Sequence, residues 1–226
     1  MVELLGHRDF LPSPLLANED GLVAIGGSLD TDILLDAYRK GIFPWYNEDL
    51  PIMWWSPDPR MVLFPEKFRL HKSFRQWMRK HPDYTVTRNR AFDRVIEYCA
   101  TVPRKDQEGT WITAEMTDAY KALHRAGYAV SYEVWNESGQ LIGGLYGVDA
   151  GNGCFSGESM FSLEPNASKR ALYELCRTAP QYGYRLIDAQ VYTPYLAQMG
   201  GELIPRRRFL ELIGYRPPSG PLGDEK

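Results

Sequence analysis

The chain has 226 residues, of which 44% are hydrophobic, and its 26 Lys and Arg against 29 Asp and Glu give a formal net charge of −3 at pH 7. This composition is typical of a globular protein with a substantial core, arranged as one large domain or two unequal ones. The weak negative charge excludes a protein that coats nucleic acid through its overall field. Any contact with nucleic acid must therefore use a local basic patch.

The start of the chain and its cysteines indicate the compartment. The first 14 residues carry charged side chains where a signal peptide needs an apolar core, and no later run approaches the length of a membrane span. We therefore expect a cytoplasmic protein. Cys99, Cys154 and Cys176 are widely spaced without a C-x-x-C pair, which favours small buried hydrophobes over a disulfide framework. The four histidines also lack a ligand spacing, so we predict no metal.

Residues 1–63 are rich in proline, glycine and tryptophan and predict a small, loop-rich first domain. It contains one clear helix from about Thr31 to Lys40, which starts after Asp30 and stops at Gly41. Prolines also bracket an aromatic group that either closes a small core or offers flat faces to the rings of a ligand. This group consists of Trp45, Tyr46, Trp54 and Trp55.

From Met61 onward the pattern alternates between strands and helices, which predicts a mixed α/β second domain over residues 64–226. An antiparallel hairpin with a glycine-bearing turn is predicted over 129–148 and is expected near the centre of the sheet. The other predicted strands are 61–64, 84–87, 154–161 and 184–192, and the helices are about 71–81, 89–99, 113–125, 165–179 and 207–213.

The helix predicted at 71–81 carries a basic surface. Apolar residues recur at helical spacing in FRLHKSFRQWMRKH, so the basic residues share the outward face. Such a face is commonly just a solvated helix surface.

Two polar groups stand out in otherwise apolar strands. Asp188 and Gln190 are two residues apart, which predicts that both side chains leave the same face of the strand. They form either a hydrogen-bonded pair at a strand end or a catalytic pair. Glu158 lies between Phe155 and Phe161, where a carboxylate pairs with a cation or shifts its pKa.

The segment GESMF and the apolar stripe of the helix at 165–179 both have a simpler, structural interpretation. GESMF lacks the last glycine of the nucleophile motif G-x-S-x-G, which makes Ser159 a poor nucleophile. On the helix at 165–179, apolar residues including Leu172 and Leu175 form one stripe, which is core unless a polar site beside it turns it into a pocket wall.

Eight blocks of the sequence occur in the order found in one protein family. They are GIFPWYNEDLPIMWWSPDPRMVLFP, EGTWIT, SYEVW, GGLYGV, GESMFS, NASKRAL, LIDAQ and IPRRRF. Through these blocks the sequence resembles the leucyl/phenylalanyl-tRNA–protein transferases. The resemblance implies transfer of leucine, phenylalanine or sometimes methionine from aminoacyl-tRNA to proteins that begin with Arg or Lys, which creates a degradation signal. It also implies a small N-terminal domain followed by a domain similar to N-acetyltransferases, with no cofactor and no membrane partner.

The resemblance also implies roles for individual residues. Asp188 and Gln190 match the catalytic pair, and Glu158 matches a carboxylate near the aminoacyl end. Trp45 and Trp111 match tryptophans that contact the terminal adenosine. The residues that match the apolar side-chain pocket are Leu145, Phe155, Met160, Leu172 and Leu175, and those that match the tRNA-contacting helix are Arg75, Arg79 and Lys80.

The chain departs from the family pattern in places. Leu145 and Leu175 stand where relatives can have bulkier residues, and Tyr195 replaces an expected histidine. An acyl-CoA-dependent N-acetyltransferase is a rival interpretation, but its pyrophosphate loop ends in Gly or Ala, whereas both candidate loops, 140–145 and 198–203, end in leucine. A binding module without catalysis is the third.

Overall fold

The computed structural model describes residues 2–103 and 111–217. The chain forms two compact units, one running from Met61 to Leu203 and the other combining the residues up to Arg60 with those from Ile204 onward. The described residues form the mixed α/β fold that the sequence predicts.

The first unit contains a four-stranded sheet in the order β1-β2-β4-β3, whose individual strands the sequence did not locate. Its strands have only two to five residues, too few for a two-residue alternation to be recognised among glycines and prolines. The elements are β1 (Glu3–Leu5), η1 (Pro14–Leu16), β2 (Leu22–Gly26), α1 (Thr31–Arg39), β3 (Phe43–Pro44), β4 (Met53–Trp55) and α7 (Arg206–Leu212).

The aromatic group of this unit divides between core and surface. Trp54 is fully buried, and its Nε1 donates a hydrogen bond to the Gly26 carbonyl oxygen at 2.8 Å. Trp45 is 44% exposed, and its ring packs edge-on against Trp55 with centroids 6.3 Å apart. Trp54 therefore closes a small core, whereas Trp45 leaves part of its ring accessible.

The second unit is organised around a seven-stranded sheet in the order β11-β5-β10-β9-β8-β7-β6. The hairpin of β7 and β8 is internal and antiparallel, but the central strand is β9. The strands are β5 (Arg60–Leu63), β6 (Thr85–Arg88), β7 (Ala129–Trp135), β8 (Leu141–Asp149), β9 (Cys154–Ser162), β10 (Leu186–Gln190) and β11 (Glu202–Ile204).

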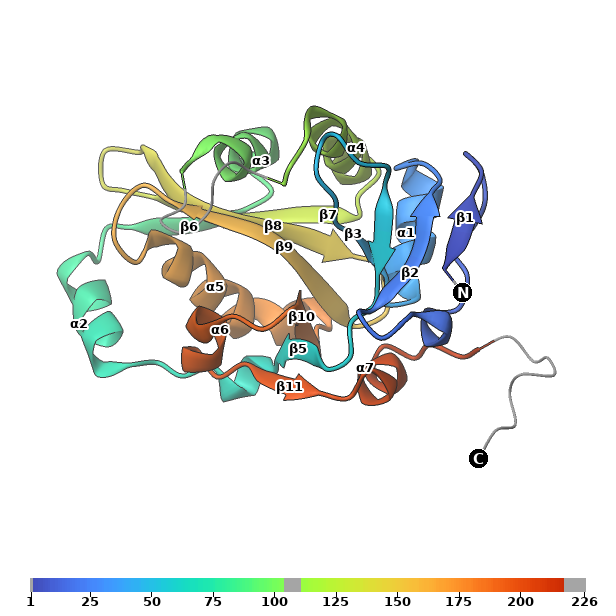
Figure 1. Cartoon of the computed structure of the whole chain (residues 1–226). Helices are drawn as coiled ribbons and strands as arrows, with labels where there is room; N and C mark the ends of the chain where they lie inside the picture. The colour runs from blue at the N-terminus through green and yellow to red at the C-terminus, as the bar shows by residue number, and fades with distance from the viewer. Residues whose placement is uncertain (1, 104–110, 218–226) are drawn as a thin grey trace. The chain divides into compact units, whose positions relative to one another are not determined.

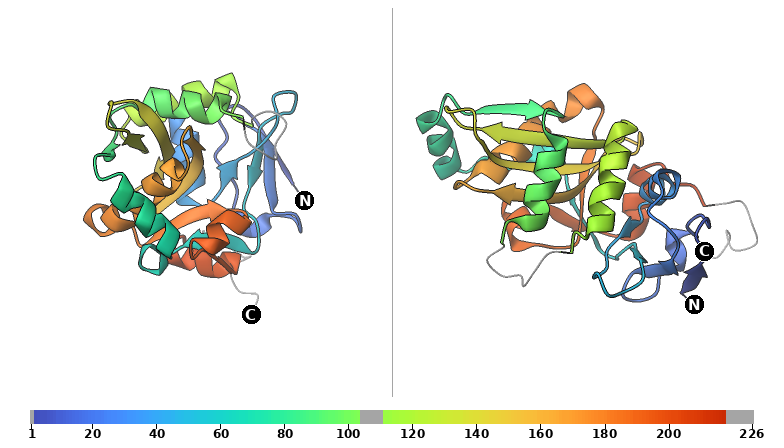
Figure 2. Two further views of the ribbon diagram at one scale, coloured as in Figure 1. Left: turned by 90° about the vertical axis from the view of Figure 1, so that its left-hand side faces the viewer. Right: turned by 90° about the horizontal axis from the view of Figure 1, so that it is seen from above.

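Helices cover both faces of this sheet, with α3 and α4 on one face and α5 on the other (Figures 1 and 2). The five helices predicted after Met61 are all present, whereas β11 and the short α6 were not predicted. The helical segments are η2 (Pro65–Lys67), α2 (Lys72–Lys80), α3 (Phe92–Thr101), α4 (Ala114–Arg125), α5 (Ala167–Thr178), η3 (Ala179–Tyr182) and α6 (Pro194–Gln198).

The cysteines are buried, as expected. Cys99, Cys154 and Cys176 are free thiols with at most 6% of their surface exposed. Burial raises the pKa of the Cys176 thiol to about 12, because the charged thiolate loses its hydration in an apolar surrounding.

Candidate active site

The end of β10 is held by the Asp188 carboxylate. Asp188 is 1% exposed, and its Oδ1 accepts a hydrogen bond from the backbone N–H of Gln190 at 3.0 Å. Gln190 has a φ of 57°, in the left-handed region that side chains other than glycine rarely occupy. Asp188 therefore stabilises a special backbone conformation at Gln190.

A β-bulge causes this conformation. Asp188 pairs with Val62 of β5 and Gln190 pairs with Met61, so Ala189 is an extra residue in the strand. The predicted two-residue alternation therefore ends at Asp188, because the extra residue re-aims the next side chain.

A second irregularity lies in β9. Tyr146 of β8 pairs with Ser159, but Gly147 pairs with Gly157, so Glu158 is the extra residue. Bulges of this kind re-aim side chains and are common beside active sites. The direction of the Glu158 side chain is thus set by the bulge in the pairing of β9 with β8.

The two irregular positions meet. Gln190 Nε2 donates a hydrogen bond to Glu158 Oε1 at 3.3 Å, and the Tyr120 hydroxyl of α4 donates one to Glu158 Oε2 at 3.0 Å. The chain Tyr120–Glu158–Gln190 fixes the orientation of the Gln190 amide. Because Nε2 donates to the carboxylate, Oε1 is the acceptor atom that this amide presents.

Tyr120 was missed by the sequence analysis. It lies on α4 with Met116 and Leu123 at core spacing and is fully buried, so the apolar stripe hides it. The available signal is that a buried tyrosine hydroxyl needs a hydrogen-bond partner.

The residues expected to form the apolar pocket lie together in one hydrophobic cluster on the α5 side of the sheet. Leu145, Phe155, Leu172 and Leu175 are each at most 3% exposed, and the half-buried Met160 packs against them. The structure therefore brings these five residues together. The use of this cluster as a substrate pocket stays a prediction.

The aromatic and basic candidates are accessible. Trp45 and the half-buried Trp111 keep ring surface available. Arg75, Arg79 and Lys80 are exposed on α2, while Phe74 of the same helix is buried. The predicted outward basic face is therefore present.

Neither of the two candidate loops for the pyrophosphate of acyl-CoA precedes a helix. Residues 140–145 run into β8, and residues 198–203 run from the end of α6 into β11. A pyrophosphate loop has to open a helix, which neither segment does.

Within residues 2–103 and 111–217, no group of three or more His, Cys, Asp and Glu side chains is placed to hold a metal ion. None of the helices within 2–103 and 111–217 has the length and apolar character to cross a membrane.

Comparisons with known proteins give the family. The family model "Leucyl/phenylalanyl-tRNA protein transferase" matches residues 62–214, and the model of that family's N-terminal domain matches residues 27–58. A leucyl/phenylalanyl-tRNA–protein transferase from Syntrophus aciditrophicus is 55% identical over 209 residues, covering 92% of this chain and 86% of the relative. One from Christiangramia forsetii is 48% identical over 210 residues, covering 92% of this chain and 98% of the relative.

The solved structures that the chain matches are more distant relatives in sequence than these transferases. FemX is 13% identical with a TM-score of 0.47, covering 82% of this chain and 71% of FemX. An acetyltransferase of the GNAT family from Staphylococcus aureus is 13% identical with a TM-score of 0.36, covering 45% of this chain and 68% of that one. The family-model matches and the identity to the relatives together show that this chain belongs to the leucyl/phenylalanyl-tRNA–protein transferase family.

Proposed function

We propose that this protein transfers leucine, phenylalanine or methionine from aminoacyl-tRNA to the α-amine of proteins that begin with Arg or Lys, and so creates an N-terminal degradation signal. Membership of the family supports this function. The reaction would take place in the cytoplasm, with charged tRNA as donor and the acceptor protein as second substrate.

The observation that carries the proposal is the hydrogen-bonded arrangement of Glu158 and Gln190 at two strand irregularities. Asp188 holds the Gln190 backbone and Glu158 holds its amide. Separate constraints on the backbone and on the side chain of one residue are what a positioning group requires, since a displacement of about 1 Å can cost about 10²-fold in rate.

The chemistry is aminolysis of an ester that is already activated. The α-amine nitrogen attacks the carbonyl carbon, a C–N bond forms, and the bond from that carbon to the ribose oxygen breaks. The amine loses a proton and the departing ribose oxygen gains one. No nucleotide energy and no covalent enzyme intermediate are needed, so positioning of the amine and ester is the main task.

Gln190 has a specific part in this reaction. An amide is too weak a base to keep a proton, so we assign its Oε1 the role of accepting a hydrogen bond from the attacking amine. The proton then passes to the ribose oxygen through the neighbouring 2′-hydroxyl or a water. Backbone N–H groups near the hairpin of β7 and β8 would stabilise the oxyanion.

The apolar cluster would set the choice of amino acid. Leu145, Phe155, Leu172 and Leu175 surround a side chain with apolar atoms, and Met160 at their margin would admit it. Charged side chains are rejected because their desolvation is costly, whereas one methylene changes binding by only about 1–3 kcal/mol. Selectivity among apolar amino acids is therefore expected to be loose.

Trp45 and Trp111 would stack on the terminal adenosine, and Arg75, Arg79 and Lys80 would contact the tRNA backbone.

The test is transfer of radiolabelled leucine from Leu-tRNA to a protein that begins with Arg. The same protein beginning with Ala is the acceptor control, and Asp188→Ala is compared with the wild type. We expect incorporation that requires Arg and falls sharply in the variant, with thermal melting confirming that the variant is folded. Absence of incorporation into either acceptor would refute the proposed function.

A further inference from the structure

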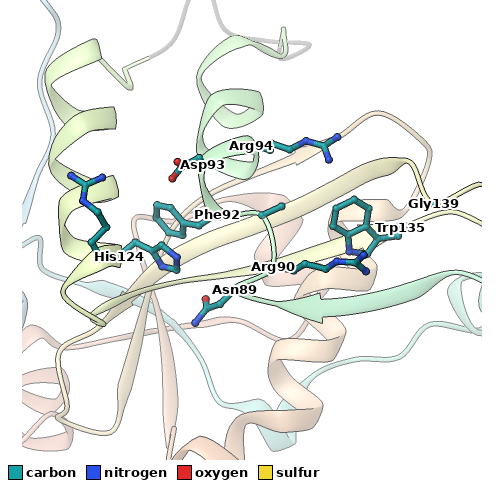
Figure 3. A pocket seen from close by; sticks show the side chains of 10 residues that line it. Asn89, Arg90, Phe92, Asp93, Arg94, His124, Trp135 and Gly139 are labelled. Carbon is teal, nitrogen blue, oxygen red and sulfur yellow. The ribbon is translucent and has the colours of Figure 1, made fainter.

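A second site lies on the α3 side of the sheet, away from the α5 cluster. It is a cavity of about 700 Å³ between the start of α3, the end of α4 and the end of β7 (Figure 3). Three of its lining residues are arginines, Arg90, Arg94 and Arg125, and all three are exposed. The lining contains one acidic residue, Asp93. The cavity therefore presents an excess of positive charge in a chain whose net charge is −3.

The floor of the cavity is rigid. Trp135 is 7% exposed, and its Nε1 donates a hydrogen bond to Thr87 Oγ1 at 2.8 Å. The guanidinium carbons of Arg90 and Arg94 lie 5.0 and 5.5 Å from the centre of its ring. Cation–π contact with an immobile ring limits the freedom of both arginines, while their N–H groups stay accessible.

The turn that carries Arg90 is also fixed. The Glu133 carboxylate is completely buried and accepts hydrogen bonds from the backbone N–H groups of Arg90 and Ala91 at 3.3 and 3.4 Å. Asn89 has a φ of 59°, and its Oδ1 accepts a hydrogen bond from the Ser131 N–H at 2.9 Å. Two separate anchors therefore hold the backbone from which this arginine projects.

His124 completes one side of the cavity. Its ring stacks on Phe92 with centroids 4.1 Å apart, and its Nδ1 bonds the carbonyl oxygen of Ala129 at 2.7 Å. Figure 3 shows this pair at one end of the cavity and Trp135 at the other. The cavity is thus walled by anchored rings and rimmed by guanidinium groups.

We propose that this arginine cavity binds backbone phosphates of the tRNA donor, an inference that rests on the proposed function. Guanidinium groups match phosphate oxygens with paired N–H donors, and an anchored set binds with less loss of side-chain entropy. The cavity also follows the basic helix α2 in sequence, because β6 leads from the residues after Lys80 to Asn89.

The experiment measures binding of uncharged tRNA as a function of salt, which does not depend on transfer. The variants are Arg90→Gln, Arg94→Gln and the double substitution. Log K, where K is the association constant for tRNA, falls linearly with the logarithm of the salt concentration. Each lost phosphate contact should make this fall less steep by about 1 and weaken binding about fivefold to tenfold at 0.1 M salt. Leucine transfer from a minimal donor, leucyl-adenosine, should keep its wild-type rate, because that donor has no phosphate backbone.

Two further variants test direction and specificity. Arg177 is an exposed arginine of α5, on the face of the sheet opposite to the cavity, where it pairs with Glu174. Arg177→Gln should leave the salt dependence of tRNA binding unchanged. Asp93→Asn removes the acid of the cavity and should tighten tRNA binding, a gain that a purely structural role for these residues would not produce. Thermal melting of every variant checks the fold.

Three results would overturn the inference. Unchanged tRNA binding in the double variant would mean that the arginines are a solvated surface. Unchanged tRNA binding with a raised KM for the acceptor protein would assign the cavity to an acidic protein segment instead. An equal loss in Arg177→Gln would mean that only the overall charge matters. Arginine-dependent tRNA binding without any transfer by the wild type would leave the site standing and refute the proposed function.

Discussion

The hydroxyl of Tyr120 offers the sharpest test of the candidate active site. Tyr120→Phe removes the hydrogen-bond donor to Glu158 Oε2, while Glu158 Oε1 is the atom that accepts the bond from Gln190 at 3.3 Å. The ring should stay in place, because it packs edge-on against Tyr146 with centroids 5.5 Å apart. A hydrogen bond to a charged group contributes about 1.5–3 kcal/mol. If about half of that energy serves to position Gln190, the rate falls about 4-fold to 12-fold.

The assay is single-turnover transfer of leucine from Leu-tRNA at saturating acceptor, which isolates the bond-forming step. We expect a rate about 4-fold to 12-fold lower with an unchanged affinity for tRNA. A double-mutant cycle with Glu158→Gln should be strongly non-additive, because both substitutions break the same chain of hydrogen bonds.

Tyr84→Phe is the matched control. The Tyr84 hydroxyl donates to Glu164 Oε2 at 2.7 Å, so the substitution removes the same type of bond at a position outside the candidate site. It should lower the melting temperature and leave the single-turnover rate unchanged. If Tyr120→Phe also loses stability but transfers at the full rate, Tyr120 has a structural role only and the positioning argument is wrong.

Three other outcomes follow from the structure. Gln190→Gly should melt near the wild-type temperature, because glycine adopts the φ of 57° without strain, but transfer should be lost with the amide. Leu172→Ala, at a position 2% exposed, should lower the free energy of unfolding by about 2–5 kcal/mol and shift competition between Leu-tRNA and Phe-tRNA towards phenylalanine. Burial raises the pKa of the Cys176 thiol from 9.0 to about 12, so the unfolded chain loses this proton first and stability falls as pH rises above 9. Urea unfolding at pH 8 and pH 10 should therefore show a smaller alkaline loss in Cys176→Ala than in the wild type.

The second unit was predictable from the sequence because its elements are long and regular. The helix at 114–125 begins where the Thr113 side chain accepts the Met116 N–H, the capping that its sequence indicates. The apolar stripe of Leu172 and Leu175 does face the core. The individual strands of the first unit could not be located from the sequence, because they are short and β3, with two residues, completes only one period of strand alternation.

The candidate site was predictable in its residues but not in its contacts. Strand periodicity places Asp188 and Gln190 on one face and leaves open what holds either side chain. The bulge at Ala189 arises from pairing with β5, which is distant in sequence, and the bulge at Glu158 arises from the register of β9 against β8. Local pattern contains no information on such pairing, so the bond from Gln190 to Glu158 could only come from the three-dimensional structure. Tyr120 could not be identified for the same reason, because its hydroxyl bonds Glu158, a residue of β9 that lies 38 positions further along the chain.

The backbone at Gln190 argues for function independently of the family. A non-glycine residue in the left-handed region costs about 1–3 kcal/mol, and such strain persists where the side chain is needed. Glycine would fit the conformation without strain, so stability alone does not favour glutamine at this position. The Asp188 carboxylate and the bulge with β5 offset the cost, and Glu158 then fixes the amide. Because all three constraints converge on one residue, two on its backbone and one on its amide, the arrangement is better explained by the orientation of the Gln190 amide than by stabilisation of the fold.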